Sequence, residues 1–130
     1  MSTHPESLNE VISLLKHESE AILNIPVTES FIHAVNLIYQ KVHIEGGKVI
    51  ASGMGKAGQI AENIATTLSS TGTPSVFLHP SEAQHGDLGI ICKNDVLIVL
   101  SNSGKTREII ELVDLTHNLW ANVPIIVITG

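Results

Sequence analysis

The chain has 130 residues, of which 43% are hydrophobic and 15% are charged, a composition typical of one folded globular domain and not of a disordered segment. Its net charge of −6 is spread along the sequence without a run of lysine or arginine, so we expect neither nucleic acid nor an anionic membrane as a partner. Cys92 is the only cysteine, which excludes an intramolecular disulfide and a thiolate metal cluster within one chain.

The amino-terminal sequence MSTHPESLNE is polar and acidic, whereas a secretory signal is first basic and then apolar. No apolar stretch reaches the roughly 20 residues that a membrane-spanning helix needs. We therefore expect a cytoplasmic protein that has no membrane partner.

The spacing of apolar residues predicts two leading helices, followed by strands that alternate with helices. In chain order, the expected elements are helices 6–23 and 28–43, strand 48–52, glycine-rich turn 53–58, helix 59–70, strand 75–78, loop 79–94, strand 95–100, helix 106–119 and strand 124–129.

Apolar strands that alternate with helices predict an α/β fold, a three-layer α-β-α sandwich with a parallel, doubly wound, flavodoxin-like sheet. The last expected strand ends at Thr129, where the next turn and helix ought to begin. We therefore expect the domain to be truncated at its C-terminal end, with one face of the last strand exposed unless a partner covers it.

The segment SGMGKAG at residues 52–58 contains the pattern G-x-G-x-x-G after a strand and before a helix. A dinucleotide site also needs an acidic residue at the end of the second strand, and here none occurs before Glu82, which disfavours NAD. By themselves the glycines fit a tight strand-to-helix turn as well as a ligand site. Lys56 favours a ligand, because a lysine in this loop can meet an anion.

The segment SNSGKT at residues 101–106 ends like the phosphate loop of a nucleotide hydrolase, but Val99 stands where that motif needs its first glycine. What remains is a cluster of polar side chains beside the first amides of a helix, a setting that favours a phosphate monoester. The alternative is that Ser103 or Thr106 only caps the helix. The polar residues of this serine loop are Ser101, Asn102, Ser103 and Thr106.

The segment HPSEAQHGDLG at residues 79–89, here called the histidine loop, places His79 and His85 near Glu82 and Asp87. Imidazole can bind a divalent metal, donate to a sugar hydroxyl or transfer protons near neutral pH. The spacing matches no standard zinc pattern. A single loop histidine is more often structural, but four such groups near two glycine loops favour a functional site.

Taken in order, these segments and STGTP at residues 70–74 resemble the sugar isomerase (SIS) domain of D-arabinose-5-phosphate isomerases. The resemblance runs from about Gly46 to the end and agrees with the two leading helices. It implies an aldose-ketose isomerase that converts D-ribulose 5-phosphate to D-arabinose 5-phosphate, the first step toward the Kdo of bacterial lipopolysaccharide or capsule. It implies no required cofactor.

The resemblance also implies roles for particular residues. Lys56 is implied as a catalytic or substrate-orienting cation, Glu108 as a catalytic carboxylate, and His79 as a residue that can bind zinc with an inhibitory effect. The residues implied or expected to contact the sugar phosphate are Ser52, Gly53, Gly72, Thr73, His79, His85, Ser101, Asn102, Ser103 and Thr106.

Isomerisation through a cis-enediol moves a proton between neighbouring carbons, which requires a base, an acid and donors for the developing oxyanion. Glu108 is the candidate base and Lys56 the candidate charge stabiliser. Glu108 has an alternative role, because a carboxylate in the first turn of a helix stabilises that helix.

We expect residues 1–130 to form one SIS domain without CBS modules, with leading helices over 1–45 and a sheet core over 46–130. The family also uses a glutamate and a histidine beyond this sequence, and its sites lie between subunits. We therefore expect a homo-oligomer, a dimer or tetramer, with the leading helices as contacts. A non-catalytic phosphosugar sensor is the main alternative, and a nucleotide-binding protein is disfavoured. The basic residues 105–107 leave the preferred sugar open.

Overall fold

The computed structural model describes residues 5–130, which divide between two compact units, residues 1–32 and residues 33–130. The described part of the first unit consists of helix α1 (Pro5–Leu23) and the start of helix α2 (Glu29–Ile38). Helix α1 agrees with the prediction for residues 6–23. None of the described helices combines the length and the apolar character needed to cross a membrane.

Helix α1 carries an apolar stripe that the described residues of its own unit leave exposed. The side chains of this stripe are between 50% and 68% exposed: Leu8, Val11, Ile12, Leu15 and Ile22. The stripe follows the helical period, which is the pattern of a helix that packs against a partner surface.

The prediction of a second α-helix over residues 28–43 is wrong in its last part, because α2 continues as the π-helix η1 (Tyr39–Ile44). The wider winding is visible in the bond from the Glu45 N–H to the carbonyl of Gln40, five residues earlier. Gly46, with φ of +76°, then ends the segment in a conformation that favours glycine. Val42 of η1 is buried against the sheet.

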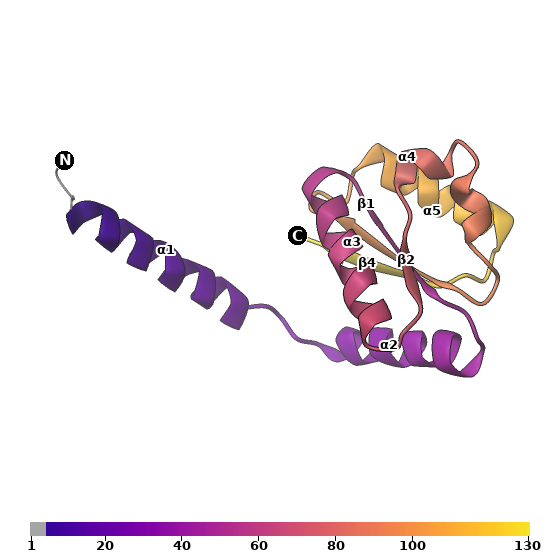
Figure 1. Cartoon of the computed structure of the whole chain (residues 1–130), viewed down its shortest axis with the longest axis horizontal. Coiled ribbons are helices and arrows are strands. Elements are labelled where there is room, and N and C mark those ends of the chain that lie inside the picture. Colours follow the sequence, from indigo (N-terminus) through magenta and orange to yellow (C-terminus); the bar gives the residue numbers. More distant parts are fainter. Residues whose placement is uncertain (1–4) are drawn as a thin grey trace. The chain divides into compact units, whose positions relative to one another are not determined.

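The second unit is built on a parallel sheet in the order β2-β1-β3-β4, with helices on both faces (Figure 1). The two middle strands are fully buried, as expected for a parallel sheet covered on both faces. This confirms the predicted α/β class. The strands are β1 (Val49–Gly53), β2 (Ser75–Phe77), β3 (Val96–Ser101) and β4 (Ile125–Thr129). The longer helices of the sheet layers are α3 (Gly55–Ser70) and α5 (Arg107–Leu119).

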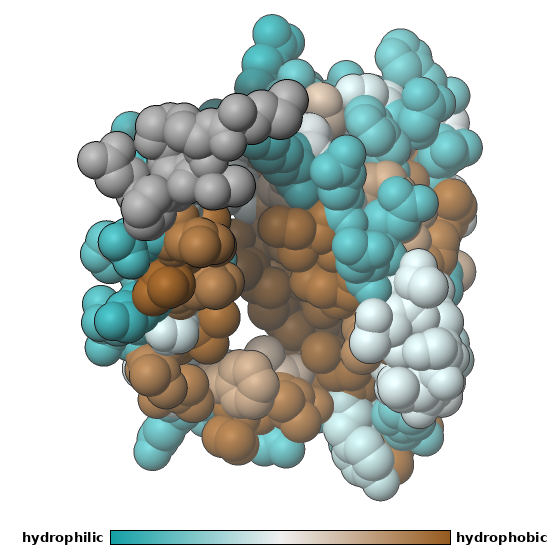
Figure 2. Space-filling model, turned by 60° about the vertical axis from the view of Figure 1, so that its left-hand side comes forward, coloured by the Kyte–Doolittle hydropathy of each residue, from teal (hydrophilic) through white to brown (hydrophobic). Residues whose placement is uncertain are grey.

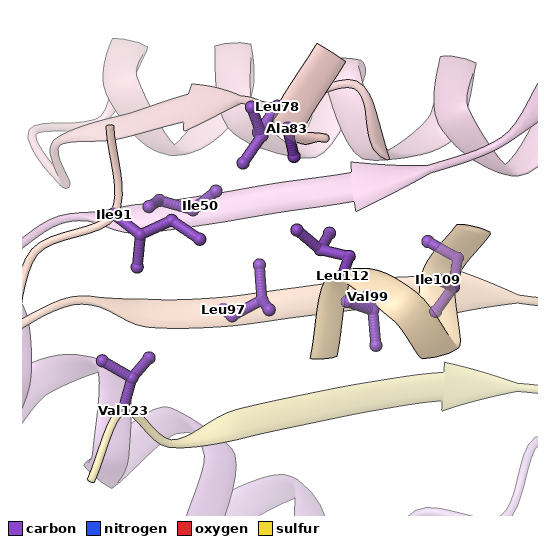
Figure 3. Close-up of a cluster of buried hydrophobic side chains, with 9 residues drawn as sticks. All are labelled: Ile50, Leu78, Ala83, Ile91, Leu97, Val99, Ile109, Leu112 and Val123. Carbon is purple, nitrogen blue, oxygen red and sulfur yellow. The ribbon is translucent and has the colours of Figure 1, made fainter. Parts of the chain in front are cut away.

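Alternate side chains of the central strands enter two separate cores. Val49 and Ala51 of β1 pack with Ala61 and Ala65 of α3 on one face. On the other face Ile50, Leu78 and Ala83 join side chains of β3 and α5, as Figure 3 shows for Leu97, Val99, Ile109 and Leu112. A fully buried leucine or isoleucine contributes about 1.5–3 kcal/mol, so these two cores hold the helices on the sheet.

Asp95 connects the beginnings of β1 and β3. Its side chain is 1% exposed and accepts hydrogen bonds from the backbone N–H of Lys48 at 2.9 Å and of Cys92 at 2.7 Å. The Lys48 ammonium lies 2.7 Å from the same carboxylate and also donates to the Ile90 carbonyl. Asp95 therefore fixes the amino ends of β1 and β3. The glycine and serine loops leave from the carboxyl ends of these strands.

The edge strand β4 leaves apolar side chains exposed on both of its faces, and not on one face as expected, because consecutive residues of a strand point to opposite faces. Val127 is 57% exposed and Ile128 is 48% exposed. In the view of Figure 2 many apolar residues, in brown, lie beside one another and are not isolated spots. An apolar area of this kind marks a surface for a partner or for further polypeptide.

The glycine-rich turn and the loop 79–94 differ from their predictions. Helix α3 begins at Gly55, four residues before the predicted start at Gln59, so most of the predicted glycine-rich turn is helical. Each strand begins within one residue of its prediction. The predicted loop 79–94 contains a short helix α4 (Pro80–Ala83) and a 3₁₀ turn η2 (Asp87–Ile90), which the polar sequence did not indicate.

Candidate active site

The glycine, histidine and serine loops leave the sheet at the same edge, the one formed by the carboxyl ends of β1, β2 and β3. In the parallel register Gly53 at the end of β1 pairs with Leu100 of β3, and Ala51 pairs with Phe77 at the end of β2. Ligands of open α/β sheets bind outside these carboxyl ends, most often where the strand order reverses. The strand order reverses here between β1 and β3, because β2 lies on one side of β1 and β3 on the other.

Close packing explains the glycines after β1. A Cβ atom on Gly58 would lie 2.5 Å from the Gly53 carbonyl oxygen, and one on Gly53 would lie 2.8 Å from the backbone of Ala57. Gly55 has φ of +57°, which disfavours other residues. These contacts account for the G-x-G-x-x-G pattern as a tight strand-to-helix turn.

Lys56 is not explained by this turn. It is exposed and occupies the second position of α3, which has no acidic residue in its first turn. A cation at the amino end of a helix is unfavourable for the helix, because that end carries the positive end of the dipole. The position is better suited to a ligand anion, which would meet both the helix amides and the ammonium.

The Ser52 hydroxyl is already engaged inside the protein and is not free to donate to a ligand. Its side chain is fully buried and its hydroxyl donates to the Leu78 carbonyl, while the Leu78 N–H donates to the Ala51 carbonyl. These bonds attach the start of the histidine loop to the end of β1. The predicted sugar contact of Ser52 therefore has a competing structural role.

The serine loop is organised by its own hydroxyls. Ser101 is 3% exposed, and its Oγ lies 2.7 Å from Thr106 Oγ1 and accepts from the Gly104 N–H at 3.1 Å. Ser103 Oγ accepts from the Lys105 N–H, also at 3.1 Å. Thr106 is the N-cap residue of α5, yet its side chain makes no capping hydrogen bond. The alternative that Thr106 only caps the helix is wrong, and the first amides of α5 remain available to a ligand.

Glu108 is half-buried in the first turn of α5, directly after the serine loop. The same helix end carries Arg107, whose Nε lies 2.6 Å from Glu111 Oε1. This bond from Arg107 is the main reason why the pKa of the Glu111 carboxyl is below its ordinary value, and Glu111 in turn raises the pKa of Arg107. Glu111 is thus an anion at neutral pH, and its pair with Arg107 is lost only as the pH falls below the ordinary range of a glutamate.

The histidine loop places its two histidines differently. His79 is the N-cap residue of α4, and its Nδ1 accepts from the Ser81 N–H at 3.2 Å. Its ring also packs edge-on against Phe77 with the ring centres 6.3 Å apart. Because Nδ1 is the acceptor, the neutral ring carries its proton on Nε2, which suits it to donate to a sugar hydroxyl. His85 is exposed.

The described residues do not fit a zinc ion at His79. A neutral ring with the proton on Nε2 has no lone pair free there, and among residues 5–130 no group of three histidine, cysteine or carboxylate side chains is placed to hold a metal.

Gly72 and Thr73 are not brought to this edge. They precede β2, at the opposite end of that strand, and the Thr73 hydroxyl lies 3.1 Å from Nε2 of His43 in η1. Gly72, with φ of +93°, turns the chain after α3. The other predicted residues lie at or after the carboxyl ends of strands, so these two would meet the same sugar only across an interface with another copy.

The link between Gln84 and Glu111 is the feature of the site that the sequence did not indicate. Gln84 Nε2 donates to Glu111 Oε2 at 2.5 Å and joins the histidine loop to α5. The two residues are 27 positions apart, and no spacing rule connects a loop glutamine with a half-buried helical glutamate.

Comparison with known proteins identifies the family of the chain. The SIS domain family model matches residues 44–130, and the chain belongs to the SIS domain family. It is 41% identical to the arabinose 5-phosphate isomerase KdsD of Francisella tularensis, over all of this chain and 38% of that protein. It is 52% identical to KdsD of Escherichia coli K12, over 65% of this chain and 25% of that protein.

Solved structures show the same fold. A Bacteroides fragilis protein assigned as a phosphosugar isomerase involved in capsule formation is 60% identical, with a TM-score of 0.94 over 95% of this chain and 65% of that one. The E. coli CFT073 protein c3406 in complex with A5P is 35% identical, with a TM-score of 0.81 over 98% of this chain and 66% of that one. The chain thus spans well under half the length of the curated relatives that it matches.

Proposed function

We propose that the chain is the sugar-phosphate domain of an aldose-ketose isomerase that interconverts D-ribulose 5-phosphate and D-arabinose 5-phosphate through a cis-enediol. The single observation that carries this proposal is the convergence of the glycine, histidine and serine loops, with Lys56 and Glu108, at one edge of the sheet. Support comes from the SIS family match and from the names of the KdsD relatives.

In this proposal the phosphate binds at the serine loop, against the hydroxyl of Ser103, the side chain of Asn102 and the first amides of α5. The carbonyl end of the sugar then lies toward Lys56, whose charge stabilises the enediolate. Glu108 removes the proton next to the carbonyl, and His79 donates from Nε2 to a hydroxyl of the sugar.

The proposal places the reaction in the cytoplasm, at the first step toward Kdo for lipopolysaccharide or capsule, without a required cofactor. Because the chain spans 38% of its F. tularensis relative, the second acid–base group is proposed to come from outside the described residues. A non-catalytic sugar-phosphate sensor would share the serine loop but would have no need of Glu108.

Ser103→Ala should weaken the binding of D-arabinose 5-phosphate by about tenfold, because a hydrogen bond to a charged group contributes about 1.5–3 kcal/mol. Titration calorimetry measures this directly. Ser70→Ala, at the distant end of α3, is the matched control and should bind as the wild type does. An unchanged dissociation constant for Ser103→Ala would remove that hydroxyl from the phosphate site.

We also propose that the protein is a homo-oligomer, a dimer or tetramer, held in part by the apolar stripe of α1. Leu15 is 64% exposed, so Leu15→Glu should lower the mass measured by light scattering, whereas Lys16→Glu, on the same helix outside the stripe, should not. A wild-type mass of a single chain at micromolar concentration would contradict this proposal.

A further inference from the structure

Buried side chains attach the histidine loop to the domain, among them Pro80 and the partly buried Leu88, which packs against the core. Helix α4 has only four residues, which is too short to be stable without tertiary contacts. One attachment is Ala83, which is 3% exposed and packs in the core with Ile109 and Leu112 of α5. Figure 3 shows this alanine near the end of the short helix, pointing into that core.

Another attachment is polar and lies one residue further on. Gln84 ends α4 and stands immediately before His85, and its side-chain amide donates to Glu111 Oε2 at 2.5 Å. The other oxygen of Glu111 accepts from Arg107 Nε at 2.6 Å. With both oxygens engaged, the Glu111 carboxylate is held in one orientation and presents a fixed acceptor to the loop.

Glu111 also stands one helical turn after Glu108, so that the candidate base and the support of the histidine loop are on the same element. A shift of the loop relative to α5 would therefore change the distance between the histidines and Glu108. Reactive geometry is sensitive to such shifts, because a misplacement of about 1 Å can lower a rate by about 100-fold.

We propose that Glu111 is a positioning residue. It acts through Gln84 to hold the histidine loop, with His79 and His85, at a fixed distance from Glu108. The catalytic meaning of this positioning rests on the proposed isomerase function. The contact between Gln84 and Glu111 does not depend on that function, and its effect on the loop can be measured without turnover.

The first test is amide hydrogen exchange, followed by mass spectrometry on the wild-type protein and three variants. Glu111→Ala and Gln84→Ala should each raise exchange in residues 80–90 severalfold, with little change in the strands. Asp114→Ala, which removes an exposed carboxylate from the same helix, should leave the loop as in the wild type. Equal exchange in residues 80–90 for the wild type and Glu111→Ala would overturn the proposal.

The second test is a kinetic cycle with D-arabinose 5-phosphate. Glu111→Ala should lower kcat by about tenfold with a smaller change in KM, and Gln84→Ala should do the same, because both break one link. The double variant should lose no more than either single one, and Glu111→Gln, which keeps an acceptor for Gln84, should recover part of the loss. Losses that multiply in the double variant, or an unchanged kcat, would overturn the proposal. A general loss of stability would give neither the shared loss of the two variants nor the recovery in Glu111→Gln.

The two tests separate this proposal from the proposed function. If the wild type neither converts nor binds the sugar phosphate, the proposed function fails, and the exchange result alone decides whether Glu111 holds the loop. If the wild type is active, loop exchange and kcat must change together in the Glu111 and Gln84 variants.

Discussion

Glu108→Gln is expected to lower kcat by about 10²–10⁴-fold while the affinity for D-arabinose 5-phosphate stays within about twofold, because the amide keeps the shape of the side chain but cannot accept the substrate proton. The residue is half-buried at the start of α5, directly after the serine loop, so the loss should fall on proton transfer and not on binding. Turnover assays and titration calorimetry on the same preparations measure the two effects separately.

The matched control for Glu108→Gln is Asp114→Asn, which removes a second acidic charge from the same helix at an exposed position away from the serine loop. It should leave both kcat and affinity unchanged. Equal losses of turnover and affinity in Glu108→Gln would instead indicate the alternative role, in which the carboxylate only stabilises the first turn of the helix.

Asp95→Asn is expected to have the largest effect on stability, a loss of about 2–4 kcal/mol in the free energy of unfolding. The carboxylate is 1% exposed and faces only donors, namely two backbone N–H groups and the Lys48 ammonium. An asparagine would turn a donor toward one of them. We expect less than the full cost of breaking a buried ion pair, because Lys48 keeps 27% of its side chain in water.

Urea unfolding followed by circular dichroism measures this loss, and Asp114→Asn is again the control, with an expected change below about 0.5 kcal/mol. Failure of Asp95→Asn to fold would agree with the expected direction. The same unfolding midpoint as in the wild type would mean that the Asp95 bonds add nothing to the connection between β1 and β3.

The strands could be predicted because burial on both faces of a parallel sheet leaves a direct mark, a continuous apolar run such as residues 96–100. The grouping of the serine-loop hydroxyls could be predicted because these residues are nearly consecutive in the sequence, and their role in binding phosphate stays a prediction. The start of α3 could not, because glycines in a loop and glycines that allow close packing of a helix on a strand look the same in a sequence.

Features that depend on distant parts of the chain were missed for a common reason. The place of Gly72 and Thr73 follows from strand direction, and the bond from Gln84 to Glu111 follows from the packing of α4 on α5. The π-helix after α2 likewise packs Val42 against the sheet, a contact with a distant part of the chain. Local patterns do not contain these tertiary contacts.

Isomerisation through an enediol at this site is tested most directly by incubating the purified protein with D-ribulose 5-phosphate in D₂O and following the mixture by NMR. The proposed function predicts D-arabinose 5-phosphate with deuterium on the carbon next to the carbonyl, because the proton that Glu108 removes can exchange with solvent. Binding of the sugar phosphate with neither product nor deuterium uptake would contradict the isomerase and leave a phosphosugar sensor.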